Sequence, residues 1–222
     1  MSFLVQTVNS PPGSIKSDIA ETLRYLGYGK HAPDTDTAAL IDECIKEFNP
    51  VISPRCCYIR VPVVINSDSV ELGFGEIKSR SLCKNLGGCD EAWVFAATIG
   101  IEADRMIARY GKTSPSKSVI VDALASSAIE CWCDEINRML CIDLKCRPRF
   151  SPGYGDFDIG HQKSLMSLLD TAVKIGLTLT DSMLMLPTKS VTAAIGISKN
   201  EDMQNDCDIC LSCDKKSCMY KK

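Results

Sequence analysis

The last sixteen residues of the chain hold four cysteines at a spacing suited to binding a metal. They form the pattern C-x-x-C-x-x-C-x-x-x-x-C and are Cys207, Cys210, Cys213 and Cys218. Four thiolates so close together can surround one tetrahedral zinc ion or one iron–sulfur cluster. The first spacings fit an iron–sulfur run, but the last gap is longer than in the bacterial ferredoxin pattern and no proline follows it. Zinc tolerates this gap better, and a reduced tail without a metal is the third interpretation.

A second group of residues with binding chemistry lies in the loop RPRFSPGYGDFDIG, residues 147–160. Its two prolines and three glycines predict a shaped turn rather than a helix or a strand. Arg149 supplies a guanidinium, which can hold a carboxylate through two parallel hydrogen bonds, and Tyr154 supplies an aromatic face and a hydroxyl. Taken singly, these residues have simpler interpretations: Arg149 is typical of a surface arginine, and Pro152–Gly153 of an ordinary turn.

The overall composition excludes several classes of protein. Of the 222 residues, 45% are hydrophobic and 24% are charged, and the net charge is −3, as in an ordinary globular domain. Because there is no basic excess, we expect neither nucleic acid nor anionic lipid as a partner. No apolar run approaches the roughly 18 residues of a membrane span, and the N-terminus lacks the pattern of a secretory signal. We therefore expect a cytoplasmic protein that does not bind membranes.

The thirteen cysteines are compatible with this location, because the cytosol keeps thiols reduced. Nine of them lie between Cys44 and Cys146, mostly within apolar runs. We interpret these nine as small residues of the hydrophobic core rather than as disulfide partners.

The spacing of apolar residues predicts the elements that must position these groups. Helices are predicted at residues 14–26, 101–110, 115–140 and 161–175, and a further helix begins at Thr35 or Thr37 and runs to residue 48. Strands are predicted at residues 57–66, 91–100, 177–186 and 190–197. Helices interleaved with hairpin-like strands indicate an α+β fold, with mixed helices around a mainly antiparallel twisted sheet. A doubly wound parallel sheet is not expected, because no glycine-rich phosphate loop joins a strand to a helix.

Three segments, in the family's order, resemble the activation domain of cobalamin-dependent methionine synthase. Arg149-Phe150-Ser151-Pro152-Gly153-Tyr154 is similar to the family's arginine–x–x–proline–glycine–tyrosine motif. Leu124–Ile136 lies where the family has a long helix with a ligand-facing glutamate, and Glu130 takes that position. Leu179–Ser182 with Ser190–Thr192 resembles a late leucine-threonine-acid-serine segment and serine-valine-serine turn. With a fainter likeness at Glu21–Tyr25, the similarity spans about residues 14–198.

The resemblance implies both a domain organisation and a ligand. Residues 1–200 would form the activation-like domain, and residues 201–222 a cysteine-rich C-terminal tail. In that family the domain holds S-adenosylmethionine, the methyl donor used when the cobalt of bound cobalamin has fallen to inactive cobalt(II). An electron and the methyl group together restore methylcobalamin. The chain would then be a component of a split methionine synthase, or an activator of another corrinoid methyltransferase.

The resemblance also implies roles for single residues. Arg149 would bind the methionyl carboxylate, and Glu130 the ammonium group or the ribose hydroxyls. Tyr154 would place its ring or hydroxyl near the sulfonium or the adenine. The remaining expected contacts are the backbone of Ser151 and Gly153, then Ser190, and His161, which would face the cobalamin. Cobalt would attack the methyl group, so no side chain is expected to be catalytic.

The chain departs from the family's pattern in three places. The family's early aspartate would fall near Gly27–Tyr28, where the acids available nearby are Asp34 and Asp36. The aromatic residue after the late turn is replaced by Ala194 or Ile195. The sequence also lacks the Asp-x-His-x-x-Gly pattern of a cobalamin-binding module. We therefore expect the cobalamin on a partner, either a cobalamin-binding methionine synthase core or another corrinoid protein, with a flavodoxin or ferredoxin as electron donor.

Two other functions stay open. The chain could be a non-catalytic module that binds and escorts a corrinoid protein. Alternatively, the tail could carry an iron–sulfur cluster that donates electrons to the corrinoid. Binding of S-adenosylmethionine would distinguish a methyl-donor role from the escort module. Visible absorption would identify the iron–sulfur cluster, because a zinc site does not absorb visible light.

Overall fold

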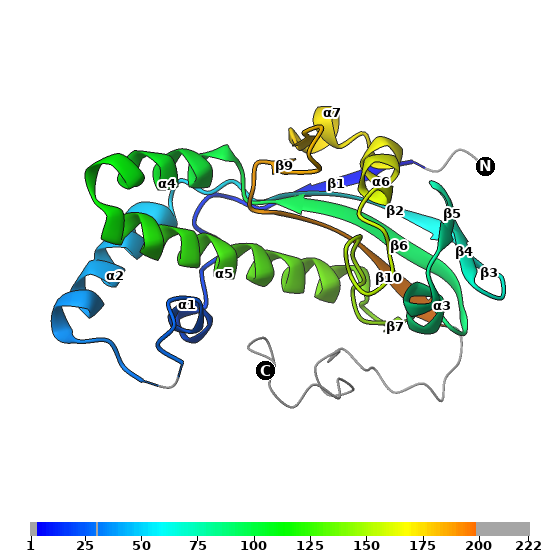
Figure 1. The fold of residues 1–222 in the computed structure, drawn as a ribbon, viewed down its shortest axis with the longest axis horizontal. Helices are drawn as coiled ribbons and strands as arrows, with labels where there is room; N and C mark the ends of the chain where they lie inside the picture. The colour runs from blue at the N-terminus through cyan, green and yellow to red at the C-terminus, as the bar shows by residue number, and fades with distance from the viewer. Residues whose placement is uncertain (1–3, 30, 199–222) are drawn as a thin grey trace.

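A computed structural model describes residues 4–29 and 31–198 of the chain. Its centre is a five-stranded sheet in the order β1-β2-β6-β10-β7, in which every neighbouring pair is antiparallel (Figure 1). The strands of this sheet are β1 (Gln6–Asn9), β2 (Arg55–Pro62), β6 (Cys89–Thr98), β7 (Lys145–Cys146) and β10 (Ser190–Ser198). The predicted α+β class with a mainly antiparallel sheet is confirmed.

Helices cover both faces of this sheet. One face packs against α1 (Ile19–Tyr25), α2 (Thr35–Phe48), α4 (Ile101–Thr113) and α5 (Pro115–Leu140). The opposite face packs against α3 (Arg80–Asn85), α6 (His161–Leu169) and α7 (Thr171–Ile175) (Figure 1). Successive side chains of a strand point to opposite faces, so Phe95 of β6 belongs to the first core and Val94 to the second.

The longest element, α5, is the helix that carries most of the candidate site. It begins with Pro115, whose missing amide hydrogen is not needed in the first helical turn. Its predicted bounds are confirmed, and of the two starts predicted for α2 the structure has Thr35. Apolar residues along α5 face the sheet and include the buried Leu124, Trp132 and Ile136, while Glu130 and Asp134 stay partly exposed on one side.

Several of the predicted elements are wrong in their bounds. The first helix starts at Ile19 rather than at residue 14, because the Asp18 carboxylate accepts the hydrogen bond from the Glu21 amide that caps it. The predicted helix at 161–175 is split at Asp170, whose left-handed backbone (φ 49°) ends α6. The predicted strand at 57–66 ends at Pro62 as β2.

The region after Pro62 contains elements that the sequence patterns do not predict. A separate three-stranded sheet is formed by β3 (Val64–Ile65), β4 (Ser69–Leu72) and β5 (Gly75–Lys78). The predicted strand at 177–186 is instead a short hairpin of β8 (Thr178–Leu179) and β9 (Met185–Leu186). Neither α3 nor the edge strands β1 and β7 are predicted.

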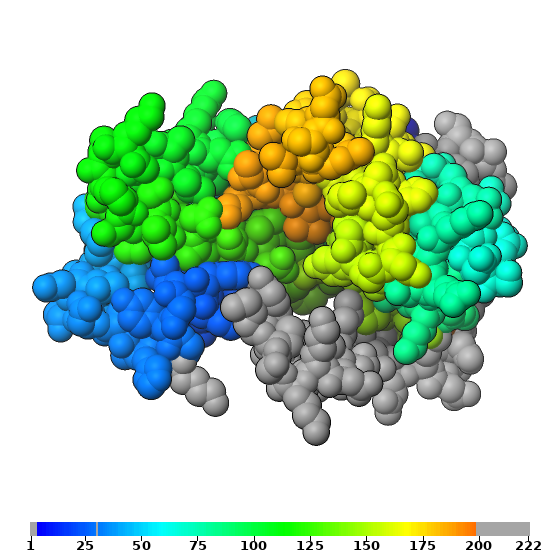
Figure 2. Space-filling model, in the orientation of Figure 1, coloured from blue at the N-terminus to red at the C-terminus, as the bar shows by residue number. Residues whose placement is uncertain are grey.

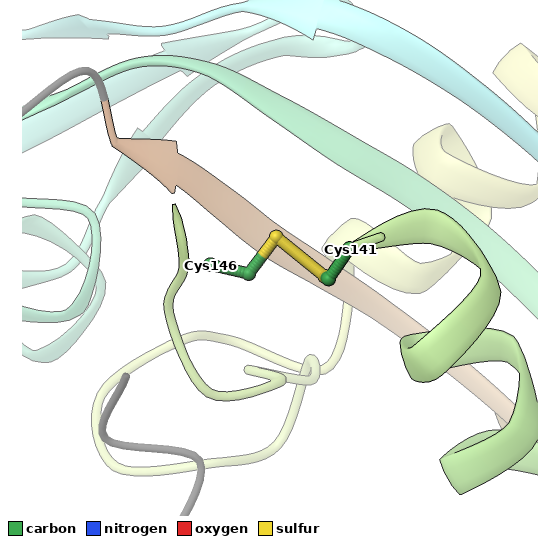
Figure 3. Close-up of a disulfide and its surroundings, with 2 residues drawn as sticks. All are labelled: Cys141 and Cys146. Atoms are coloured by element: carbon green, nitrogen blue, oxygen red, sulfur yellow. A yellow bond between two sulfur atoms is a disulfide. The ribbon is translucent and has the colours of Figure 1, made fainter. Parts of the chain in front are cut away.

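One disulfide corrects the interpretation of the nine cysteines. Cys141, which caps the C-terminal end of α5, is bonded to Cys146 of β7, and their Cα atoms lie 6.0 Å apart (Figure 3). The chain turns back tightly after α5, with the Leu144 amide donating to the Cys141 carbonyl, and this brings the two side chains together. The other seven are free thiols that are buried or partly buried, as expected.

The predicted metal ligands Cys207, Cys210, Cys213 and Cys218 lie outside the described residues. Within the described residues, no group of three or more histidine, cysteine, aspartate or glutamate side chains is arranged to hold a metal ion. No helix in this part of the chain is long and apolar enough to cross a membrane.

Candidate functional site

The centre of the candidate site is an arginine shared by two carboxylates. Nη2 of Arg149 lies 3.0 Å from Oε2 of Glu130 and 3.2 Å from Oδ1 of Asp134. The two acids are four residues apart on α5, so they stand on the same side of the helix. Arg149 comes from the segment after β7, where Phe150 forms an isolated antiparallel bridge with Ala194 of β10. The site therefore lies where this segment crosses α5.

The other terminal nitrogen of Arg149 has no partner among the residues that the structure describes. Its Nη1 is buried and makes no hydrogen bond to any described residue. A buried donor left unpaired costs about 1–3 kcal/mol, so such groups are normally satisfied in a folded protein. Nη1 is therefore an unsatisfied donor beside two negative charges.

Tyr154 completes this group of residues. We call the group, which consists of Arg149, Glu130, Asp134 and Tyr154, the Arg149 cluster. Its side chain is 55% exposed, and its ring meets that of Phe150 edge to face at a centroid distance of 6.0 Å. Partial burial and the negative charge of Glu130 raise the pKa of the Tyr154 phenol, so the hydroxyl stays protonated at neutral pH. It can therefore donate a hydrogen bond while its ring offers an aromatic face.

Hydrogen bonds within the loop fix the backbone around Tyr154. The Gly153 amide donates to the Phe157 carbonyl at 2.7 Å, and the Tyr154 amide donates to the Ser151 carbonyl at 3.0 Å. Gly153 has φ 94°, a left-handed conformation that glycine adopts without strain. The sequence predicts ligand contacts from the backbone of Ser151 and Gly153. Of those groups, the Gly153 amide and the Ser151 carbonyl are already used inside the turn.

Asp156 attaches the same loop to the start of α3. Its Oδ1 accepts hydrogen bonds from the Ser79 hydroxyl at 2.5 Å and from the Ser81 amide at 3.0 Å, and its Oδ2 accepts one from the Arg80 amide at 2.9 Å. These bonds favour the carboxylate and hold the pKa of Asp156 well below its usual range. At neutral pH the loop is therefore clamped to α3 two residues after Tyr154.

Two predicted site residues lie apart from the Arg149 cluster. Ser190 is buried, and its hydroxyl donates to the Pro187 carbonyl at 2.7 Å. It lies four residues along β10 from Ala194, the bridge partner of Phe150, a separation of about 13 Å along a strand. His161 begins α6 and packs against Phe157 at a centroid distance of 5.7 Å. Ligand roles for Ser190 and His161 stay predictions.

Asp134 is a member of the cluster that the sequence interpretation misses. Its position one helical turn after Glu130 is the signal that could have identified it, because residues four apart share a helix face. Asp34, considered as a substitute for the family's early aspartate, instead caps α2. Its carboxylate accepts from the amide and the hydroxyl of Thr37 at 2.9 and 3.0 Å, which lowers the pKa of Asp34.

A second polar cluster lies on the same side of α5. Nζ of Lys189 is 2.8 Å from Oδ1 of Asp122 and 2.9 Å from Oγ of Ser126. On the face shown in Figure 2, the segment of Lys189 and the start of β10 (orange) lies between α4 and α5 (green) and the loop of Tyr154 (yellow-green). Lys189 and Arg149 therefore both pair with acidic side chains of α5.

Two surface hollows lie near these helices. One, of about 330 Å³, borders Asp122 and Ser126 of α5. The other, of about 160 Å³, lies between α2 and α4 and is lined mainly by charged side chains. Among these, Arg105 and Glu102 pair with each other at 2.5 Å. The larger hollow adjoins the second polar cluster, whereas the smaller one has no contact with either cluster.

Comparison with known proteins supports the predicted resemblance. The family model described as "Vitamin B12 dependent methionine synthase, activation domain" matches residues 146–203, which include the loop of Arg149 and Tyr154 and all of β10. Among solved structures, the MetH reactivation domain bound to AdoHcy matches with a TM-score of 0.68 at 16% sequence identity. The match covers 90% of this chain and 80% of that chain. No curated protein sequence matches the chain significantly.

These findings confirm the resemblance to the methionine synthase activation domain and show that the chain has the fold of the MetH reactivation domain. The family model covers the loop that supplies Arg149 and Tyr154 but does not reach α5 and its acids. AdoHcy is the ligand of that solved domain.

Proposed function

We propose that the chain binds S-adenosylmethionine at the Arg149 cluster and presents its methyl group to the cobalt of a corrinoid held by a partner protein. The observation that carries this proposal is the buried, unpartnered Nη1 of Arg149 beside Glu130 and Asp134. A free cationic donor next to two carboxylates is complementary to an amino acid zwitterion. The ligand carboxylate would take Nη1, and its ammonium group would lie against the acids of α5.

The same arrangement suits the sulfonium of this ligand. Glu130 and Asp134 place two negative charges beside one guanidinium, so the cluster can accept a further positive charge. The ring of Tyr154 adds an aromatic face, which attracts cations through its quadrupole. The AdoHcy bound to the MetH reactivation domain is the demethylated form of the proposed ligand and supports this assignment.

The chain's own part in the reaction would be positioning. Methyl transfer from a sulfonium to a reduced corrinoid cobalt, which a one-electron donor such as flavodoxin or ferredoxin must first reduce, needs no protein nucleophile. The thiol of Cys133 interacts electrostatically with Arg149 and Glu130. Cys133 is fully buried, and burial raises the pKa of its thiol to about 12. It stays protonated at neutral pH and cannot compete for the methyl group. Arg149 and the acids of α5 would hold the donor in one orientation.

The assignment of the corrinoid to a partner rests on the sequence. Neither histidine of the sequence lies in an Asp-x-His-x-x-Gly pattern. The likeness to a methionine synthase activation domain favours a cobalamin-binding methionine synthase core, or a related corrinoid protein, as the partner. In this proposal residues 1–200 of the chain form an activation-type domain, and the cysteine-rich tail, residues 201–222, follows it.

The second candidate function is a module that binds a corrinoid protein without donating a methyl group. It is favoured by one observation: Asp34 is occupied in capping α2, so it does not replace the family's early aspartate in the described site.

Zinc, an iron–sulfur cluster and a metal-free tail stay open for Cys207, Cys210, Cys213 and Cys218. An absorption spectrum of the anaerobically purified chain would distinguish a cluster from the other two.

Calorimetric titration of S-adenosylmethionine into the full chain and into Arg149→Ala tests the proposed function. The wild type should bind, and the variant should lose at least tenfold in affinity. Arg138→Ala is the matched control, because Arg138 is an exposed arginine near the end of α5 that pairs with Glu135 at the surface. A folded wild type that does not bind S-adenosylmethionine would overturn the methyl-donor proposal and leave the second candidate.

A further inference from the structure

We infer that α3 is a brace for the Arg149 cluster, and that Asp156 and Asn85 are the positioning residues that connect this helix to the loop of Arg149 and Tyr154. This role rests on the proposed function, because it explains how the side chains proposed to hold the ligand are kept in place. The sequence patterns do not predict α3, and the family model does not cover it.

The first support is that α3 is bonded to the loop on both sides of the candidate site residues (Figure 1). At the start of the helix, two backbone amides of the first turn donate to the Asp156 carboxylate at 2.9 and 3.0 Å. At the end of the helix, Nδ2 of Asn85 donates to the Pro148 carbonyl at 3.3 Å. The two attachments therefore enclose residues 149–155.

The second support is the short distance over which α3 closes the loop. Eight residue steps separate Pro148 from Asp156, and an extended chain of that length would span about 26–29 Å. The six residues of α3 cover only about 9 Å along the helix axis. Because both attachments are on this helix, the chain between them must arch away from it. The arch carries Arg149 to the acids of α5 and leaves Tyr154 exposed.

The third support is that the turn containing Asp156 starts at Tyr154. The Phe157 amide donates to the Tyr154 carbonyl at 2.9 Å, which closes a four-residue turn with Gly155 and Asp156 at its centre. Gly155 lies so close to α3 that a Cβ there would be 2.6 Å from Oγ of Ser81. Holding Asp156 on α3 therefore fixes the backbone of Tyr154 and restricts where its ring can lie.

The two attachments differ in strength. Asp156 accepts from two amides and from the Ser79 hydroxyl, and bonds to a charged group are roughly twice as strong as neutral ones. Asn85 makes one neutral bond to the loop, and its buried Oδ1 has no partner among the described residues. Asp156 is therefore the main positioning residue and acts on Tyr154, whereas Asn85 acts more weakly on Arg149 through the preceding carbonyl.

Titration of the Tyr154 phenol tests the positioning without a ligand. In the wild type, partial burial raises the pKa of this phenol most, Glu130 and Cys133 raise it further, and Arg149 lowers it. If Asp156→Asn frees the turn, the ring becomes better hydrated and its pKa should fall toward the ordinary value of about 10. Carbon-13 NMR of labelled tyrosine rings measures this pKa, and Tyr154→Phe identifies the signal.

Two variants are the matched controls. Asp158→Asn removes the same charge from the same loop, but the Asp158 carboxylate accepts from the Gly160 amide within the loop. Asp34→Asn removes an exposed carboxylate that caps α2 in the same way, by accepting from the amide and the hydroxyl of Thr37. Both should keep the Tyr154 pKa of the wild type. Circular dichroism and thermal unfolding verify that each variant is folded.

Calorimetric titration of S-adenosylmethionine into the full chain measures the effect on the ligand. Asp156→Asn should bind roughly fivefold more weakly than the wild type, because the ring is no longer pre-organised, and Asn85→Ala should lose less. Since Asp156 acts through Tyr154, adding Asp156→Asn to Tyr154→Ala should cause no further loss. Asp158→Asn and Asp34→Asn should bind as the wild type does.

A Tyr154 pKa that falls in Asp156→Asn and in neither control supports the brace. An unchanged pKa in Asp156→Asn, or an equal fall in Asp158→Asn, would overturn it and leave the proposed function untouched. The same holds if the wild type binds S-adenosylmethionine and the losses of Asp156→Asn and Tyr154→Ala simply add. If the folded wild type does not bind S-adenosylmethionine, the proposed function is overturned, and the Tyr154 titration alone decides whether α3 positions the loop.

Discussion

Arg149 and Glu130 meet across the junction of two segments, with Nη2 of the arginine 3.0 Å from Oε2 of the glutamate. Nη2 of the guanidinium contacts both acids of α5, Glu130 and Asp134, while its buried Nη1 has no partner among the described residues. An arginine in this arrangement is oriented before a ligand arrives, and pre-organisation of this kind reduces the entropy lost on binding.

Replacing Arg149 with lysine should weaken S-adenosylmethionine binding even though the charge is kept. Lysine has a single ammonium group and cannot donate to Glu130, Asp134 and a ligand carboxylate in the fork geometry of a guanidinium. Loss of one charge-assisted hydrogen bond, about 1.5–3 kcal/mol, corresponds to roughly a tenfold to hundredfold rise in Kd. Calorimetry of Arg149→Lys measures this change, with Arg138→Lys as the exposed control. Equal affinity of wild type and Arg149→Lys would contradict the role given to Nη1.

The clamp between Asp156 and α3 should make stability depend on acid pH. Because the folded pKa of Asp156 is depressed, its contribution is present above the unfolded value of about 3.9 and is lost as pH falls toward the folded value. Asp156→Asn should therefore unfold more easily than the wild type at pH 7, and the gap should narrow below about pH 4. Urea unfolding at several pH values measures the gap, and Asp181→Asn, at an exposed position in the β8–β9 turn, serves as the control. A gap that stays constant down to pH 2 would show that the carboxylate charge is not the cause.

Gly155 should resist substitution more strongly than another glycine of the same conformation. A Cβ at Gly155 (φ 57°) would lie 2.6 Å from Oγ of Ser81, whereas a Cβ at Gly29 (φ 58°) would meet no atom within 4 Å. Both Gly→Ala changes carry the left-handed penalty of about 1–2 kcal/mol, so the clash should make Gly155→Ala the more destabilising. The free energies of unfolding of the two variants measure the clash directly. Equal losses would mean that Ser81 and the loop of Tyr154 move apart without cost.

The free thiols should differ in reactivity according to burial. Burial raises the pKa of Cys57 and of Cys133 to about 12, so both stay protonated and protected in the folded chain. Cys83 and Cys131 are only partly buried and should be alkylated first. Peptide mass spectrometry after brief treatment with iodoacetamide at pH 8 ranks these four thiols. Early labelling of Cys133 would contradict the close packing around the Arg149 cluster.

Removing the disulfide between Cys141 and Cys146 should destabilise the chain moderately. The bond closes a short loop, with a sequence separation of 5, and constraint of the unfolded chain by such a loop contributes about 2 kcal/mol. Urea unfolding of Cys146→Ser should show a loss of this size. The wild type in reducing buffer should match the variant, and a wild type that is unaffected by reductant would indicate that the bond does not contribute.

The sequence predicts best the parts of the site that follow local rules. The helix at 115–140 is predictable because a long apolar periodicity follows Pro115 at its first turn. The loop of Arg149 and Tyr154 is predictable because prolines and glycines exclude regular structure there. The pairing of Arg149 with Glu130 follows from neither rule, because it depends on how the segment after β7 crosses α5.

Other features escape prediction for tertiary reasons. The β4–β5 hairpin has strands of four residues, too short for an alternating pattern to stand out from its polar and glycine-containing surroundings. The break at Asp170 depends on the left-handed backbone of that residue, and the spacing of apolar residues does not predict a backbone conformation of this kind. Lys189 reaches Asp122 across 67 residues of sequence, and only the folded sheet brings them together.

The two polar clusters on α5 differ in the length of chain that must be ordered to form them. Arg149 meets Glu130 across 19 residues, and the Cys141–Cys146 disulfide lies inside that interval. Lys189, by contrast, meets Asp122 nearer the start of α5 across 67 residues. Contacts between near neighbours in sequence form quickly and can survive partial opening, whereas distant contacts are lost with the whole sheet. We therefore expect slow amide exchange around Glu130 to outlast that around Asp122 under mild denaturation, so that the Arg149 contact with α5 forms first and the Lys189 contact last.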